Sequence, residues 1–211
     1  MASASRILGV LLLLGAMGAG AAATDADTSD AEDRALEATI AELHSGSKEQ
    51  RRFAVQHLAD AQSERATEGL IAALDDSRVS EAAVAALAQR AQQPSLSRRA
   101  IEGLIHALDN RKARVRESAV HGLADVDTQR STEGLIHALD GADAESERAA
   151  VTALARRARG SVSDERAVEG LIHALDSDES DVRRQAVDGL RAVDSERARQ
   201  GLEKAAAASA R

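Results

Sequence analysis

One block of sequence, Glu-Gly-Leu-Ile, recurs along this chain at nearly regular intervals. Intact copies begin at Glu68, Glu102, Glu133 and Glu169, and weaker copies begin at Glu37 and Gln200. With the Gly position as reference, the copies stand at 38, 69, 103, 134, 170 and 201, so the gaps are 31, 34, 31, 36 and 31 residues. Such periods are typical of solenoids, in which each unit buries its apolar face only against neighbouring units. The alternation of short and long gaps indicates duplication of a two-repeat unit.

Each copy predicts two helices. The first, the A helix, carries Gly-Leu-Ile-x-Ala-Leu, and a good N-cap residue stands six positions before the reference Gly in Ser63, Ser97, Thr128, Asp164 and Ser195. The second, the B helix, carries Ala-Val-x-x-Leu, as in Ala54 to Leu58, which makes one apolar face at helical spacing. Helices of about a dozen residues are marginal alone, so the pairs must stack. The predicted fold is all-α, an α-solenoid.

The spacing divides the chain into five helix pairs and a last single helix. The repeat domain covers 34–211, with repeats at about 34–62, 63–93, 97–127, 128–160 and 164–194, and a terminal helix at 195–208. This last helix is an A helix without a partner, in which Lys204 takes the place of a His found in earlier copies. We expect it to cap the array with a polar outer face.

The N-terminus has the composition of a signal peptide over residues 1–23. Arg6 gives a positive start, an apolar run follows from Ile7 to Met17, and Ala21-Ala22-Ala23 gives a small-residue cleavage site. The alternative is a retained membrane anchor, for which the run is at the short end. Residues 24–33 are acidic and poor in large apolar residues, which predicts a disordered linker. The chain is therefore predicted to be exported, to a bacterial periplasm or to the outside, with no membrane contact after cleavage.

Composition removes several classes of function. The 35 acidic residues outnumber the 27 Lys and Arg, giving a net charge of −8, which argues against nucleic acid and anionic membranes. Phe53 is the single aromatic residue, so stacking on bases or sugars is disfavoured. There is no Cys, which excludes disulfides, thiolate catalysis and Cys-based zinc sites.

The segments 164–176 and 181–190 resemble the HEAT-like repeat of the phycobilisome-lyase type. The resemblance covers roughly residues 34 to 211 and implies a right-handed superhelix whose B helices line the concave surface. The Val-Arg pair of that family stands at Val115-Arg116 and Val182-Arg183 but is degraded in other copies. Its loop Asp is matched only by Asp76, so no regular Asp–Arg ladder is expected. Arg116 and Arg183 lie near the buried side of their helices and are interpreted as structural.

The outer face of the A helices carries a repeated triplet. Helical spacing places together Arg99-Glu102-His106, Arg130-Glu133-His137 and Arg166-Glu169-His173. An Arg stands four before the reference Gly in all six copies, and it is interpreted as a pairing residue for Asp60, Asp125 or Asp194. The alternative is an anion-binding stripe. Each Glu–His pair offers two metal ligands where zinc takes four, and adjacent pairs lie about 10 Å apart, so no metal site or cofactor is predicted.

The outward positions of the B helices are the candidate partner surface, because solenoids bind through such extended faces. They comprise Arg52, Phe53, Gln56, Glu117, His121, Arg148, Thr152, Arg184 and Asp188. Phe53 is either an anchor for the partner or a core residue of the first repeat.

These patterns predict a non-enzymatic scaffold, exported and monomeric, that binds an unknown protein partner electrostatically through its helical surface. No nucleophile with a base and an orienting group is visible in the sequence. The alternative is an accessory enzyme or a metal-binding protein, similar to lyase-type chaperones or to a hydroxylase such as deoxyhypusine hydroxylase. That hydroxylase binds iron through His-Glu dipeptides, and none of the six His residues here is followed by Glu.

Overall fold

The structure is a computed structural model that describes residues 25–141, 143–160 and 164–209. The chain divides into a first unit, residues 1–35, and a second unit, residues 36–211. The predicted signal peptide lies outside the described residues. Helix α2 (Asp25–Ser45) includes residues 25–33, for which the sequence predicts a disordered linker. The structure differs there because five of the nine residues 25–33 are acidic, and negative charge at the start of a helix is stabilised by the helix dipole.

In the second unit the helices alternate between two layers. The A layer continues from α2 with α4 (Glu64–Ala72), α6 (Ser97–Ala107), α8 (Gln129–His137), α10 (Glu165–His173) and α12 (Glu196–Ser209). The B layer contains α3 (Lys48–Asp60), α5 (Ser80–Ala91), α7 (Ala113–Ala124), α9 (Ala144–Ala158) and α11 (Ser180–Arg191). Short 3-10 turns, η1 (Ala73–Asp75), η2 (Ala138–Asp140) and η3 (Ala174–Asp176), end three of the A helices.

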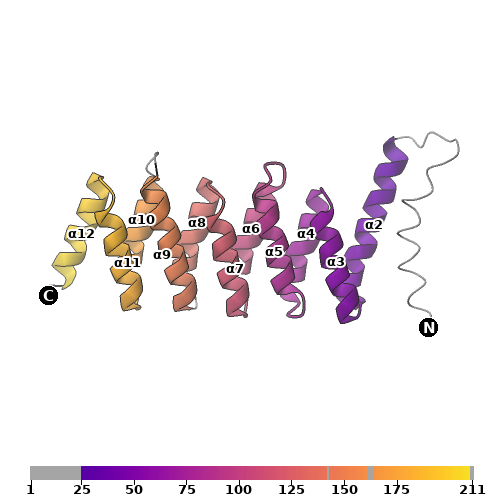
Figure 1. The fold of residues 1–211 in the computed structure, drawn as a ribbon, viewed down its shortest axis with the longest axis horizontal. Helices are drawn as coiled ribbons and strands as arrows, with labels where there is room; N and C mark the ends of the chain where they lie inside the picture. The colour runs from indigo at the N-terminus through magenta and orange to yellow at the C-terminus, as the bar shows by residue number, and fades with distance from the viewer. Residues whose placement is uncertain (1–24, 142, 161–163, 210–211) are drawn as a thin grey trace. The chain divides into compact units, whose positions relative to one another are not determined.

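From α4 to α11 each A helix packs against the B helix of its own repeat, and from α3 to α12 the equivalent helices of successive repeats pack against one another (Figure 1). The described residues contain no strand. The predicted all-α solenoid, with five helix pairs and a C-terminal helix, is confirmed. The handedness of its superhelix and the concavity of the B face stay predictions.

The recurring Gly and Ile interlock between neighbouring repeats. A Cβ added to Gly134 would lie 2.8 Å from Cγ1 of Ile105, the Ile of the preceding block, and 2.9 Å from Cδ1 of Leu123. The same contact joins Gly170 to Ile136. Contacts this short leave no room for a methyl group, so the Gly lets each A helix approach the previous one closely. The Leu residues of the block, such as Leu135, are fully buried beside this contact.

Four of the five predicted N-caps are confirmed. The side-chain oxygens of Ser63, Thr128, Asp164 and Ser195 each accept a backbone N–H from the first turn that follows. Ser97 is the exception. Helix α6 already begins with its N-cap at Leu96, and the Ser97 hydroxyl donates to the carbonyl of Pro94 at 3.3 Å. The turn at Pro94 therefore leads the chain into the helix one residue earlier than the sequence suggests.

Candidate functional site

Ion pairs that run between neighbouring repeats cover the outer face of the A helices. Four of the recurring Arg residues extend toward the Glu of the preceding block, as in Arg65–Glu37 at 2.5 Å and Arg166–Glu133 at 2.6 Å, whereas Arg130 pairs with Glu133 of its own block at 3.1 Å. The same register gives Arg99–Glu68 at 3.6 Å and Arg197–Glu169 at 2.8 Å. The predicted partners Asp60, Asp125 and Asp194 are therefore wrong. They lie at the ends of B helices, whereas the Arg side chains lie along the neighbouring A helix.

The His residues of this face also contact the preceding repeat. His173 Nε2 lies 2.7 Å from Asp140 Oδ1, His137 Nε2 lies 3.6 Å from Asp109, and His106 Nε2 lies 4.0 Å from Asp75. The Asp in each case ends the preceding Ala-Leu-Asp. Among the described residues no group of three or more His, Asp or Glu side chains is placed to hold a metal ion. The charged groups of this face are thus engaged mainly by one another.

A second set of ion pairs holds the loops before the B helices. Arg51 bonds Asp76 at 2.6 Å and Arg116 bonds Asp143 at 2.7 Å, with the Arg side chains only 13% and 12% exposed. For Asp143, burial raises the pKa, but the Ser146 amide and Arg116 outweigh it and hold the pKa below its usual value. The structural interpretation of Arg116 is confirmed. The sequence analysis did not identify Asp143, because this residue stands two positions later than the loop Asp of the family pattern, in a longer loop.

Two buried Arg residues, Arg90 and Arg157, were not foreseen. Arg157 donates to Thr132 Oγ1 at 2.7 Å and to the carbonyls of Leu123 and Val126 at the end of α7. Arg90 makes the equivalent bonds to Thr67 and to the end of α3. Burial lowers the pKa of both guanidinium groups, and the negative end of each helix offsets the buried charge. A signal existed, since each Arg stands seven residues after the first Ala of its Ala-Val pair, on the apolar face.

The B helices pack closely at every second interface. A Cβ added to Gly122 of α7 would lie 2.9 Å from Cβ of Ala88 in α5, and Gly189 of α11 meets Ala155 of α9 at 3.0 Å in the same way. At the position equivalent to these Gly residues, α5 carries Ala86 and α9 carries Ala153. A methyl group therefore stands where α7 and α11 have only a hydrogen. We call α5/α7 and α9/α11 the close interfaces, and α3/α5 and α7/α9 the wide interfaces. Arg90 and Arg157 belong to the wide interfaces.

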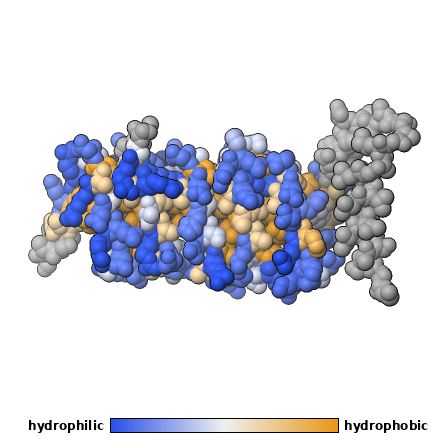
Figure 2. Space-filling view, in the orientation of Figure 1, coloured by the Kyte–Doolittle hydropathy of each residue, from blue (hydrophilic) through white to orange (hydrophobic). Residues whose placement is uncertain are grey.

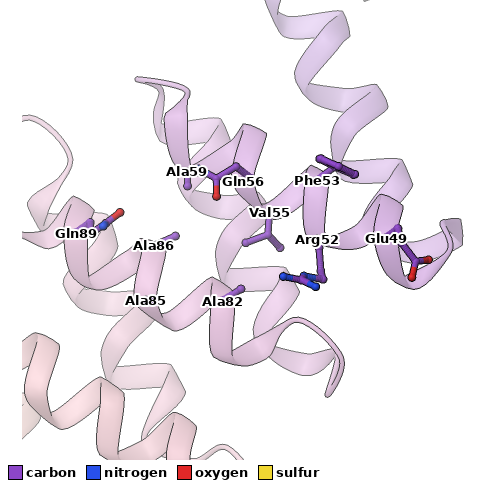
Figure 3. A pocket seen from close by; sticks show the side chains of 10 residues that line it. All are labelled: Glu49, Arg52, Phe53, Val55, Gln56, Ala59, Ala82, Ala85, Ala86 and Gln89. Atoms are coloured by element: carbon purple, nitrogen blue, oxygen red, sulfur yellow. The ribbon is translucent and has the colours of Figure 1, made fainter. Parts of the chain in front are cut away.

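Each wide interface opens into a groove on the B face. The first groove lies between α3 and α5, and it is lined by Glu49, Arg52, Phe53, Val55, Gln56, Ala59, Ala82, Ala85, Ala86 and Gln89 (Figure 3). The second groove lies between α7 and α9, with Gln185 of α11 at its border, and its main polar residues are His121, Glu145, Arg148, Thr152, Arg156 and Arg159. Figure 2 shows apolar side chains exposed along the middle of this face, between hydrophilic edges.

The grooves gather six of the nine predicted surface residues. Arg52, Phe53 and Gln56 line the first groove, and His121, Arg148 and Thr152 line the second. Phe53 is 69% exposed, so the alternative that it fills the core is wrong.

Three predicted residues do not line either groove. Glu117 is half-buried on α7, while Arg184 pairs with Asp181 at 2.8 Å and Asp188 lies 3.9 Å from Arg191. Sequence reasoning missed Gln89 of α5, a helix that carries none of the nine predicted residues, and Arg156 and Arg159, which stand one and two turns after Thr152 on α9.

Within the described part of the chain, no helix combines the length and the apolar composition needed to cross a membrane. No curated protein matches the chain in sequence. Among solved structures, a designed armadillo repeat protein in complex with the peptide (KR)4 is 24% identical, with 83% of this chain and 89% of that chain covered and a TM-score of 0.53. Computationally designed armadillo repeat proteins for modular peptide recognition are 25% identical, with 82% and 88% covered and a TM-score of 0.53.

Human deoxyhypusine hydroxylase in complex with glycerol is also similar, at 16% identity, with 97% of this chain and 84% of that chain covered and a TM-score of 0.42. The family model for HEAT repeats matches residues 36–124 and 132–211, which is most of the chain. The stacked helix pairs and this match agree, and the chain belongs to the family of HEAT repeats.

Proposed function

We propose that this chain is a non-enzymatic scaffold that binds a protein partner through the exposed face of its B helices. The observation that carries the proposal is the difference between the two faces. Most charges of the A face bind neighbouring repeats, whereas the B face has two open grooves and an exposed aromatic side chain at Phe53. Exposed aromatic and Arg side chains are the residues that most often dominate binding energy.

The similarity to armadillo repeat proteins designed for modular peptide recognition supports a polypeptide as the partner. Arg52 makes no ion pair among the described residues, and the Arg side chains of the second groove add positive charge. Binding with a strong electrostatic component weakens as salt rises, because mobile ions screen the exposed charges. The accessory-enzyme alternative has no observation in its favour among the described residues.

Charge reversal tests the surface. Crosslinking in the cell that exports the protein, followed by identification of captured proteins, is carried out with the parent chain and with Arg52→Glu combined with Arg148→Glu. We expect capture to be lost. A matched control reverses the same number of charges at Arg98 and Arg111, which are exposed and line neither groove. Capture that survives in the first variant and is lost in the control would move the binding surface to the A face.

We further propose that the chain is exported and acts as a monomer. The positive start, apolar run and Ala-rich site within residues 1–23 support export. N-terminal sequencing of protein from the extracytoplasmic fraction should find a new terminus close to Thr24. A full-length chain that stays in the membrane fraction would instead support the retained anchor. Light scattering of the purified protein measures the mass that distinguishes a monomer from a larger assembly.

A further inference from the structure

The two grooves of the B face are built on equivalent positions of the repeat. When the Ala-Val pairs of α3 and α7, and those of α5 and α9, are aligned in sequence, six lining residues of one groove match six of the other. The equivalent pairs are Gln56 with His121, Ala59 with Ala124, Ala82 with Ala149, Ala85 with Thr152, Ala86 with Ala153, and Gln89 with Arg156. The groove is therefore a feature of the two-repeat unit, and it recurs at every second interface.

Packing explains why the groove follows this period. At the close interfaces Gly122 and Gly189 draw neighbouring B helices together, which removes space on the surface. At the wide interfaces Ala86 or Ala153 stands at the position of the Gly, and the buried Arg90 or Arg157 binds the end of the preceding helix. The groove is thus fixed by core residues, and its lining residues are free to differ in chemistry.

The first groove has an apolar centre bordered by the polar side chains of Glu49, Arg52, Gln56 and Gln89. Phe53 and Ala85 are exposed beside it, and Val55, Ala59, Ala82 and Ala86 contribute further methyl groups (Figure 3). Such a surface favours an apolar side chain of the partner, since contact between that side chain and the Phe53 ring removes apolar area of both from water.

The second groove has an excess of positive charge. Arg148 pairs with Glu145. Arg156 donates to the carbonyl of Ala124, and Arg159 donates to the carbonyl of Ala155 at 3.0 Å, so neither charge is neutralised by a carboxylate among the described residues. Asp125 is the other acidic residue of the lining. In a chain of net charge −8 this local excess complements an acidic side chain.

We propose that the two grooves bind one extended peptide segment, with an apolar side chain in the first groove and an Asp or Glu in the second. This proposal rests on the proposed function and specifies its partner. Two helix-packing steps of about 10 Å separate the grooves, and an extended chain advances about 3.3 Å per residue, so about six residues join the two side chains. An even separation also places both side chains on the same side of an extended chain. The close α5/α7 interface between the grooves supports the backbone that crosses it.

Selection from a phage-displayed library of random 12-residue peptides against the full chain tests the proposal. The expected consensus is an aromatic or large aliphatic residue and an Asp or Glu five to seven positions apart. For a synthetic peptide with this consensus, Phe53→Ala and the double variant Arg156→Glu with Arg159→Glu should each raise the dissociation constant about tenfold or more. The control variant Arg98→Glu with Arg111→Glu should change it less than about twofold. The altered side chains are exposed, and circular dichroism checks that the variants fold.

The two variants should also affect different parts of the consensus. Phe53→Ala should remove the preference for an apolar residue, and the double Arg variant should replace the acidic preference by a preference for Lys or Arg. Peptides with no fixed spacing, or a spacing of about thirteen residues as an α-helix would require, contradict the extended mode. If no peptide is selected but cellular capture still depends on Arg52 and Arg148, the peptide mode is wrong and the scaffold function stands. If capture also ignores these residues, both proposals fail.

Discussion

Replacing Arg157 by Met should destabilise the protein more than any substitution on its surface. Met keeps most of the volume of the Arg stem but cannot donate, so Thr132 Oγ1 and the carbonyls of Leu123 and Val126 lose a buried donor. The Val126 carbonyl keeps the Ser131 hydroxyl and the Leu123 carbonyl keeps the Val126 amide as donors, so each of the three lost hydrogen bonds costs about 1 kcal/mol. Relief of the buried charge offsets part of the total, which leaves a loss of about 2 to 3 kcal/mol in the free energy of unfolding.

Urea denaturation followed by circular dichroism measures this loss, and the neighbour Arg156 provides the control. Arg156 is exposed, and its hydrogen bond to the Ala124 carbonyl lies at the surface where water can replace it, so Arg156→Met should change the unfolding free energy by less than about 0.5 kcal/mol. Amide hydrogen exchange should show that protection in Arg157→Met falls first at the end of α7 and along α9. Arg157→Lys keeps the charge but loses the planar set of guanidinium donors. Its free energy of unfolding should therefore lie between those of the parent chain and of Arg157→Met. Equal stabilities of Arg157→Met and Arg156→Met would refute the reasoning.

Three further predictions concern the contacts between repeats. Gly134→Ala should cost about 1 to 3 kcal/mol through overpacking, and Ile105→Ala in the same chain should recover part of that loss in a double-mutant cycle, whereas additive losses would deny the contact. The folded-state pKa of Asp143 is lowered from its ordinary 3.8, so its contribution to stability is present above that pH and lost as the pH falls through the folded value. In Asp143→Asn the free energy of unfolding should therefore fall less steeply at acidic pH than it does in the parent chain. An unchanged dependence on pH would contradict this. Metal analysis of the purified chain should give the same content with and without the His side chains, and a stoichiometric metal lost on their removal would support the metal-binding alternative. The three residues changed to Ala are His106, His137 and His173.

The sequence predicts the layers and faces of this fold well, because the apolar spacing of the A and B helices is set by local geometry. Contacts between repeats are harder to predict, because they depend on how one helix is placed along the next. Helical spacing puts the recurring Arg outward, but only the stacked helices show that Arg65 and Arg166, for example, bind the Glu of the preceding block. Arg90 stands on an apolar face, where a charged residue is rarely fully buried, so its sequence position alone does not reveal its role.

The grooves could be predicted only in part. Helical spacing correctly placed Arg52, Phe53 and Thr152 at the surface, yet it gave equal weight to Glu117, which does not line a groove. The grooves lie at the interfaces where an Ala stands in place of the Gly that meets the neighbouring B helix elsewhere. The sequence alone does not show the effect of Gly or Ala at this position, because the distance between two helices depends on how their side chains pack together.

The alternation of close and wide interfaces restricts how such an array can change in length during evolution. Removing one repeat would bring together two B helices that do not pack against each other in the present array. It would also leave a buried Arg without the helix end that it binds. Removing two consecutive repeats, such as the stretch between Gly69 and Gly134, would restore both the Gly–Ala contact and the Arg contact in phase. Related chains should therefore differ in length by insertions and deletions of about 65 to 67 residues, and each such event would add or remove one complete groove.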